Sequence, residues 1–306
     1  MLNIVDVPFQ AGVVPDAAHV QHLFEEGLAF HRQNRLDNAV AAYEQVLRLM
    51  PGHAGALHHV GIVAFQAGNY HIAAGFLRSA IAIDPSVPAR HCDLGNACKE
   101  IGHNEEALQA YASALALDAN YLDAYFNRAI TLHDMGRFEE ALQDYTQVIS
   151  RNPEEAAVLN NAGMILHRLG RHEQALDNLE RAVAIDDGYL EAHRNRCQVL
   201  EALQRFDAAL EACAKMIAIA PALGDGYLQR ALLQLKLKQL EPALLDADAA
   251  VRLAPNQPEG YRVRGMVLHA LERFAEAVDS YDTALKLSPD DAALHGQRES
   301  AQARLQ

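Results

Sequence analysis

The sequence repeats every 34 residues through eight copies, without an insertion or deletion. The period is clearest in alanine, which recurs at Ala39, Ala73, Ala107, Ala141, Ala175, Ala209, Ala243 and Ala277. A unit of this length cannot bury a core by itself, so the pattern predicts an array in which each copy packs against its neighbours. With the recurring alanine at repeat position 20, the copies span 20–53, 54–87, 88–121, 122–155, 156–189, 190–223, 224–257 and 258–291.

Small residues at a second position predict that each repeat is a pair of antiparallel helices. Position 8 is small in every copy, at Gly27, Gly61, Gly95, Ala129, Gly163, Cys197, Ala231 and Gly265. Two helices approach most closely where their side chains are small, so positions 8 and 20 are expected to join the first helix of a repeat to the second. Positions 20, 24 and 27 share the i, i+4, i+7 spacing of one helix face and predict the buried side of the second helix.

Glycine and proline mark the expected ends of these helices. Position 15 is glycine in repeats 2 to 5, where a residue that tolerates positive φ can end the first helix. Gln204, Lys238 and Glu272 occupy this position in repeats 6 to 8, so those turns must form without glycine. Proline at position 32 predicts the end of the second helix in six repeats, whereas Ala119 and Asp187 replace it in the other two.

The segments that flank the array carry their own signals. Residues 1–19 hold an apolar leader and the start of the first helix, which Asp16 is predicted to cap. A C-terminal capping helix is expected within 292–306, begun by Asp290 and Asp291. The leader is either a tail frayed from or packed on the first repeat, or a built-in peptide that occupies a groove; its apolar residues are Leu2, Ile4, Val5, Val7 and Phe9.

A small residue at position 8, alanine at 20, a frequent aromatic at 24, a small residue at 27 and proline at 32 resemble the tetratricopeptide repeat. The resemblance covers about residues 20–291. It implies an all-α fold, an α-solenoid in which eight helix-turn-helix repeats and a capping helix form a right-handed superhelix. It also implies a concave groove lined mainly by the first helix of each repeat, and binding of another protein there.

Charge and composition limit the class of partner. The net charge is −14 and both halves of the chain are acidic, which disfavours nucleic acid and anionic membrane surfaces and favours basic or neutral protein segments. The four cysteines lack CxxC spacing and are expected to be reduced thiols. No stretch approaches the length of apolar sequence that crosses a bilayer, and a cytoplasmic location is expected.

Nothing in the sequence predicts an enzyme. Nucleophile elbows, phosphate-binding glycine loops and dinucleotide motifs are absent, so neither catalysis nor a cofactor is expected. The nearest approach to a metal-binding cluster is His58, His59 and His91, which shows no obvious carboxylate or thiolate beside it, and no metal site is expected. Cys92, at position 5, is predicted by the resemblance to face the groove and is therefore the one thiol to test for reactivity.

Polar residues at position 6 are the main candidates for binding a peptide. They are Asp93, Asn127, Asn161, Asn195 and Gln229. The series resembles the asparagine ladder of the repeat arrays in O-linked N-acetylglucosamine transferases, where amides could bond an extended peptide main chain. The alternative is a hydrogen bond that stacks successive helices, and the sequence leaves both interpretations open.

Further groove candidates are Asn96, Glu100, Asp123, Asp134, Arg194 and Gln198. The carboxylates among them predict a ligand with Lys or Arg beside repeats 3 and 4. Arg128 and Arg230 at position 7 could be taken for a basic binding stripe, but Asp144 and Asp246 at position 23 of the same repeats favour structural ion pairs.

These patterns predict a scaffold or adaptor that binds a peptide segment of a partner protein. Two alternatives remain from the sequence. The array could self-associate as a homo-oligomer, or it could be a regulatory or substrate-binding subunit of a glycosyltransferase-type enzyme.

Overall fold

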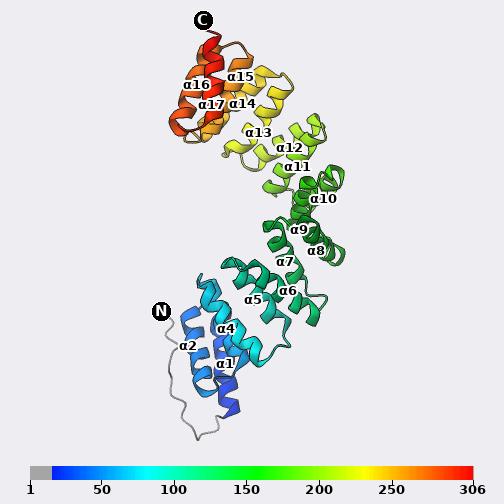
Figure 1. Ribbon diagram of the computed structural model, residues 1–306, viewed down its shortest axis with the longest axis vertical. Helices are drawn as coiled ribbons and strands as arrows, with labels where there is room; N and C mark the ends of the chain where they lie inside the picture. Colours follow the sequence, from blue (N-terminus) through cyan, green and yellow to red (C-terminus); the bar gives the residue numbers. More distant parts are fainter. Residues whose placement is uncertain (1–15, 306) are drawn as a thin grey trace. The chain divides into compact units, whose positions relative to one another are not determined.

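The computed structural model describes residues 16–305, which fall into two compact units divided after Arg151. The described residues form seventeen α-helices and no strand. Each 34-residue repeat becomes two helices joined by a short turn, so odd-numbered helices open the repeats and even-numbered helices close them (Figure 1). The apolar leader lies outside the described residues.

The first unit contains four helix pairs from repeats 1 to 4. The helices are α1 (Ala17–Arg32), α2 (Leu36–Leu49), α3 (Ala54–Gln66), α4 (Tyr70–Ile83), α5 (Pro88–Glu100), α6 (Asn104–Leu117), α7 (Leu122–Asp134) and α8 (Phe138–Arg151). Asp16 caps α1 as predicted, because its side chain accepts a hydrogen bond from the Ala18 amide.

The second unit contains the other four pairs and one further helix. The helices are α9 (Ala156–Arg168), α10 (His172–Ile185), α11 (Leu190–Ala202), α12 (Phe206–Ile219), α13 (Gly224–Lys236), α14 (Leu240–Leu253), α15 (Pro258–Ala270), α16 (Phe274–Leu287) and α17 (Ala292–Ala303). Asp291 caps α17 by accepting from two backbone amides, and α17 buries Leu294 and Ala301 against the last pair. The helix thus covers apolar surface that the repeats would otherwise leave exposed.

The predicted buried side of the even-numbered helices is confirmed. All eight alanines at position 20 are fully buried, and the residues at positions 24 and 27 are at most 4% exposed. Glycine at position 8 makes room for the side chain at position 24: an added Cβ on Gly95 would lie 2.5 Å from Cε1 of Tyr111. In repeat 2, an added Cβ on Gly61 would also lie 3.3 Å from the carbonyl oxygen of Ala73 at position 20. Small residues therefore set the spacing of each pair.

Every turn after an odd-numbered helix has the same backbone, whether or not it contains glycine. Position 15 has a positive φ in all eight repeats, including 58° at Gln204, 60° at Lys238 and 61° at Glu272. The amide at position 16 bonds to the carbonyl at position 11, as from Arg205 to Leu200 at 2.8 Å. This six-to-one bond is the Schellman ending of a helix, so the hydrogen bonds hold non-glycine residues in the left-handed conformation.

Proline at position 32 is not required to end the even-numbered helices. α6 and α10 precede Ala119 and Asp187, yet they end at the same repeat position as the helices followed by proline. At both ends the aspartate at position 31 accepts a hydrogen bond from the backbone two residues later, as Asp118 does from the Asn120 amide at 2.8 Å. The same Asx turn forms at Asp84 in repeat 2, which keeps Pro85, so the aspartate makes this turn with or without proline.

Candidate functional site

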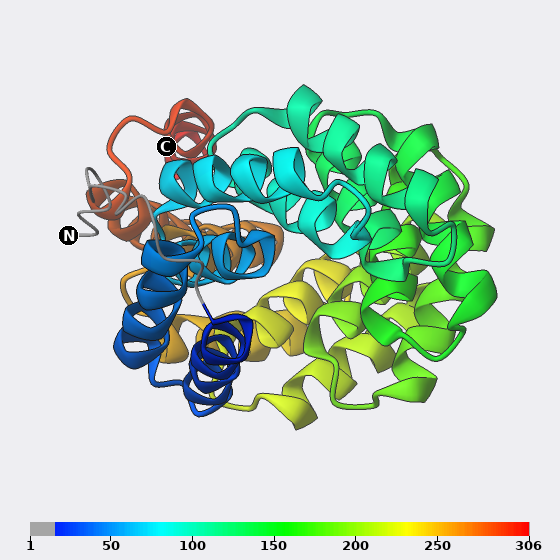
Figure 2. The same cartoon turned by 90° about the horizontal axis from the view of Figure 1, so that it is seen from below.

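The odd-numbered helices form the candidate binding surface of each unit, which we call the odd-helix face. α5 contacts α3 and α7 in the first unit, and α15 contacts α13 and α17 in the second, whereas the main contacts of even-numbered helices are with odd-numbered ones. A stack in which one helix of each pair packs against its counterpart curves toward that side, and repeat arrays bind ligands on such concave surfaces. Seen along the array in Figure 2, the helix pairs of each unit follow one another in this stack.

The polar residues at position 6 bridge successive odd-numbered helices in three repeats. In each case the partner is the position 5 residue of the preceding repeat, 35 residues earlier. The pairs are Asp93 with His58 (2.7 Å), Asn127 with Cys92 (3.8 Å) and Asn195 with Asn160 (2.8 Å). This geometry favours the helix-stacking interpretation for these residues, because their polar atoms already have partners within the fold.

The rest of the position 6 series is placed differently. Asn161 accepts a hydrogen bond from Asn160 Nδ2 over 3.4 Å, within α9. Gln229 on α13 is half-buried. A peptide-binding role for the whole series stays a prediction.

Exposed carboxylates gather on α5 and α7 of the first unit. Glu100, Asp123 and Asp134 are all exposed. Glu100 lies 3.1 Å from Lys99 Nζ, Asp134 lies 3.4 Å from His133 Nδ1, and no ion pair is found for Asp123 among the described residues. Asn96 lies within α5 and is half-buried; its Oδ1 accepts a hydrogen bond from the Tyr111 hydroxyl at 2.9 Å, which leaves its Nδ2 for a ligand. The negative potential of this face is therefore only partly neutralised from within.

On the corresponding face of the second unit, one exposed carboxylate has an intramolecular cation. Arg194 at position 5 donates to Asp225 at position 2 of the next repeat over 2.6 Å. Gln198 is half-buried on α11. The position 2 carboxylate of repeat 7 thus has an intramolecular cation, which Asp123 at the same position of repeat 4 lacks.

The position 7 arginines are structural, as predicted. Arg128 makes two 2.7 Å bonds to Asp144, and Arg230 makes two 2.7 Å bonds to Asp246. Sequence reasoning missed a related pairing across repeats, in which Arg264 Nε bonds to Asp248 at 2.7 Å. The aspartate precedes Arg264 by 16 residues, as Asp282 precedes Arg298, and this repeated spacing could have signalled the pairing.

The expectation that Cys92 faces the groove is wrong, and its thiol is not placed to react. Its side chain is 2% exposed in the α5–α7 contact, and burial raises the pKa of its thiol to about 12, assisted by the negative charges of Asp93 and Asp123. A buried thiol of high pKa is a poor nucleophile. Cys197 and Cys213 are fully buried core residues as predicted, with their sulfur atoms 3.1 Å apart.

The histidine group near the N-terminus differs from expectation in one respect. A carboxylate does lie beside it, since His58 contacts Asp93. His59 instead stacks on the Tyr43 ring, with centroids 5.5 Å apart, and burial lowers its pKa to about 4. Among the described residues, no group of three or more His, Cys, Asp or Glu side chains is placed to hold a metal ion.

Comparison with known proteins identifies the repeat. Patterns described as tetratricopeptide repeat match residues 19–88, 122–188 and 258–291, and one described as TPR repeat matches 95–136; together they cover more than half of the chain. The chain belongs to the tetratricopeptide repeat family. The resemblance drawn from the repeat positions is thereby confirmed, as is the all-α array of this tetratricopeptide repeat (TPR) protein.

One curated relative carries a catalytic name. A probable UDP-N-acetylglucosamine--peptide N-acetylglucosaminyltransferase SPINDLY from Eustoma exaltatum subsp. russellianum is 32% identical over 103 residues. The match covers 31% of this chain and 11% of the relative, so the TPR chain spans about a tenth of that protein.

Two solved structures share the fold. A tetratricopeptide repeat protein from Parabacteroides merdae ATCC 43184 matches 81% of this chain and 98% of its own, with a TM-score of 0.60 and 19% identity. YrrB, described as a TPR protein with an unusual peptide-binding site, matches 64% of this chain and 97% of its own, with a TM-score of 0.54 and 22% identity. Within residues 16–305, no helix has both the length and the apolar character needed to span a membrane.

Proposed function

We propose that this TPR protein is an interaction scaffold that binds a basic peptide segment of a partner on the odd-helix face of its first unit. The observation that carries the proposal is the set of exposed carboxylates on consecutive odd-numbered helices, Glu100 on α5 with Asp123 and Asp134 on α7. Complementary charge speeds and orients the binding of a cationic segment.

The hydrogen bonds between successive odd-numbered helices determine which polar groups remain available to a ligand. Asn127 and Asp93 already bond to neighbouring helices, so the proposed contacts are made by the exposed carboxylates and by the Asn96 amide. Exposed charge pairs contribute little each and are screened by salt. Affinity for a basic segment is therefore expected to depend on several carboxylates together and to fall as salt is raised.

A pair of matched variants tests the proposal. A lysine-rich peptide and its glutamate-substituted counterpart are titrated into the full chain at low and physiological salt. Asp123→Asn should weaken binding of the lysine peptide by several-fold, whereas Asp225→Asn, at the same repeat position but paired with Arg194, should not weaken it. Equal binding of both peptides, or an equal effect of the two substitutions, would refute the proposed face.

A second candidate follows from the SPINDLY match. The array would serve as a substrate-binding part of a glycosyltransferase, because the matched relative carries that activity in its name. Adding the chain to a glycosyltransferase encoded beside it should then raise the rate of peptide glycosylation. An unchanged rate would remove this candidate and leave the scaffold proposal standing.

A further inference from the structure

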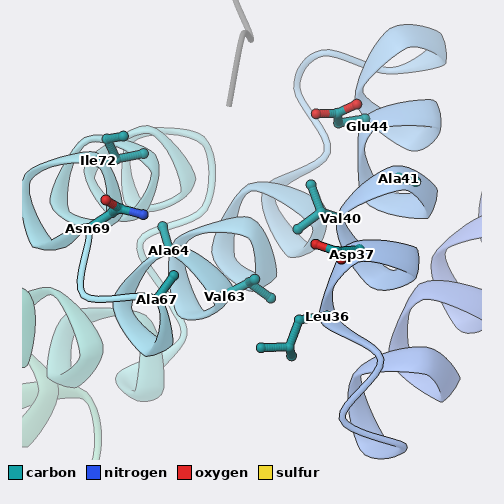
Figure 3. A pocket seen from close by; sticks show the side chains of 10 residues that line it. All are labelled: Leu36, Asp37, Val40, Ala41, Glu44, Val63, Ala64, Ala67, Asn69 and Ile72. Carbon is teal, nitrogen blue, oxygen red and sulfur yellow. The ribbon is translucent and has the colours of Figure 1, made fainter. Parts of the chain in front are cut away.

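An apolar pocket opens on the side of the even-numbered helices, away from the carboxylates of the proposed peptide face. It lies between α2, the C-terminal end of α3 and the start of α4, with a volume of about 760 Å³. This is within the roughly 300–1,000 Å³ typical of ligand-binding sites. We call it the outer pocket; its lining is Leu36, Asp37, Val40, Ala41, Glu44, Val63, Ala64, Ala67, Asn69 and Ile72 (Figure 3).

The outer pocket lies at the junction between repeats 1 and 2. The equivalent junction between repeats 3 and 4 shows which side chains make the outer pocket apolar. There Arg137 makes two 2.7 Å bonds to Glu140 and lies 3.8 Å from Glu105 of the preceding repeat, so charged side chains line the junction. In repeat 2, the positions of Arg137 and Glu140 are taken by Asn69 and Ile72. The bridging cation is missing, and an aliphatic side chain stands in place of its partner.

The outer pocket leaves apolar surface exposed among its polar residues. Ile72 is 41% exposed, and in Figure 3 it faces across the pocket toward Val40 and Leu36, with Val63 at the floor. Leaving such surface in water forgoes about 25 cal/mol for each Å² that a partner could cover. A gathered apolar patch bordered by polar residues is typical of an interaction site.

The rim of the outer pocket carries uncompensated negative charge. Asp37 is exposed, and no ion pair is found for it among the described residues. Glu44 has only Arg48 at 3.7 Å, one turn away on the same helix. The position 16 residue that carries a cation in repeat 4 is the uncharged Asn69 here. A cation brought by a ligand would therefore meet two carboxylates that the fold leaves mostly unneutralised.

We propose that the outer pocket binds a partner protein segment that inserts an aliphatic side chain and places an adjacent Lys or Arg on the rim. The aliphatic group fills the space between Val40, Val63 and Ile72, and the cation lies beside Asp37 or Glu44, which are two turns apart on α2. This is a second surface, separate in residues and helices from the carboxylates on α5 and α7. It does not depend on the function proposed for them.

Charge favours this partner segment over two occupants that the protein itself could supply, its leader and a second copy of the chain. The leader, residues 1–15, contains Asp6 and no Lys or Arg. Among the described residues, the most exposed large apolar residue is Leu245 at 71%, and Glu241 lies one turn away on the same side of α14. Either would bring negative charge to an acidic rim, which favours a basic partner segment over the leader or a second copy.

Methyl-labelled protein gives a direct test with the full chain. The probe is a short peptide with one leucine flanked by lysines. Its addition should shift the methyl resonances of Ile72, Val63 and Val40 and leave those of Ile83, 48% exposed near the end of α4, unchanged. Replacing the leucine of the peptide by serine should abolish the shifts, and replacing its lysines by glutamates should weaken binding by about tenfold or more.

A substitution in the protein completes the test. Ile72→Ser should lower the affinity for the leucine peptide by about tenfold, and Ile83→Ser should leave it unchanged. Circular dichroism confirms that both variants fold, and the peptide series on the unaltered chain decides the question if one does not. Asp123→Asn, which tests the odd-helix face, should have no effect on this binding.

Four outcomes would overturn the proposal. The Ile72 and Val63 methyls fail to shift, or the serine peptide binds as well as the leucine peptide. A nuclear Overhauser contact from Ile72 to Phe9 in the peptide-free chain would show that the leader fills the pocket. Shifts that depend on protein concentration alone would show that a second copy does.

Discussion

The two units close their helix pairs with different residues at the same two repeat positions. The first unit sets a small residue at position 8 against a tyrosine or leucine at position 24, as in Gly95 with Tyr111. The second unit keeps this arrangement at its ends, but repeat 6 pairs Cys197 with Cys213 and repeat 7 pairs Ala231 with Ala247. In the two repeats where position 24 holds a small residue, position 8 is not glycine. In repeats 6 and 7 a smaller side chain at position 24 is thus accompanied by a larger one at position 8.

The turns show a second difference. The first unit places glycine at position 15 in three of four repeats, with Asn34 in the remaining one. The second unit has a single glycine, Gly170, and three long polar side chains, yet all of them adopt a positive φ. The backbone hydrogen bonds are the same in both units, so the second unit bears a conformational cost that the first mostly avoids.

The largest loss of stability is expected when the glycine at position 8 is replaced by a residue with a side chain. Gly95→Cys places a Cβ 2.5 Å from the Tyr111 ring and should lower the free energy of unfolding by about 3 kcal/mol. Adding Tyr111→Cys recreates the pair of repeat 6, and the double variant should be more stable than the sum of the two single effects by about 1 kcal/mol or more. Urea unfolding monitored by circular dichroism measures all three.

Gly75 supplies the control for this substitution. It lies in α4, where an added Cβ would meet nothing within 4 Å. Gly75→Cys should leave stability unchanged or slightly raised, because it removes a flexible residue from a helix. If Gly95→Cys cost no more than Gly75→Cys, the trade of volume between positions 8 and 24 would be the wrong explanation.

The next largest loss of stability is expected when a position 6 asparagine is replaced, and the loss should differ between the two units. Asn195 is 6% exposed and donates to Asn160 at 2.8 Å, so Asn195→Ala strands a buried carbonyl oxygen and should cost about 2 kcal/mol. Asn127 donates only to the Cys92 sulfur at 3.8 Å, a weak acceptor, and Asn127→Ala should cost less than about 1 kcal/mol. Hydrogen exchange of α9, α11, α5 and α7 locates each effect. Equal costs would mean that the bond to sulfur is as strong as the bond between amides.

A smaller loss of stability is expected in the first unit when the pH is lowered. The pKa of His59 is about 4 in the fold and 6.5 when unperturbed, since burial disfavours its charged form. The unfolded chain therefore takes up a proton below pH 6.5 that the folded chain resists, so this contribution is fully present above pH 6.5 and is lost as the pH falls toward 4. Because His59 is only partly buried, the loss by pH 5 should be about 1 kcal/mol.

His59→Phe is the matched variant for the pH effect. Phenylalanine keeps a ring against Tyr43 but cannot titrate. Hydrogen exchange of α1 to α4 should then lose the part of its dependence between pH 5 and 7 that the unaltered chain shows. An identical dependence in both proteins would assign the titration to another group.

The smallest effects are expected at the turns. Gln204→Gly relieves a side chain held at φ 58° and should raise the free energy of unfolding by about 0.5 to 1 kcal/mol, and Gly102→Gln in the first unit should lower it by about 1 kcal/mol. Thermal unfolding of each variant gives the sign. A loss of stability in Gln204→Gly would show that the side chain, and not the backbone, stabilises that turn.

The sequence alone predicted the helix pairs, their order and their buried sides. Those features follow from local spacing, because Ala141 and its seven counterparts fall on one helix face whatever surrounds them. The caps at Asp16 and Asp291 were also predictable, since a cap bonds to amides two or three residues away. Even the pairing of Arg128 with Asp144 followed from a fixed separation within one repeat.

The tertiary structure decided which polar residues a ligand can reach. Whether Asn195 or Asp93 has a partner depends on the position 5 residue of another repeat and on how two odd-numbered helices stack. The burial of Cys92 and the opening of the outer pocket depend on three helices at once. The period of a repeat fixes which face of a helix is apolar, but hydrogen-bond partners and cavities arise between elements, where the sequence pattern holds no distances.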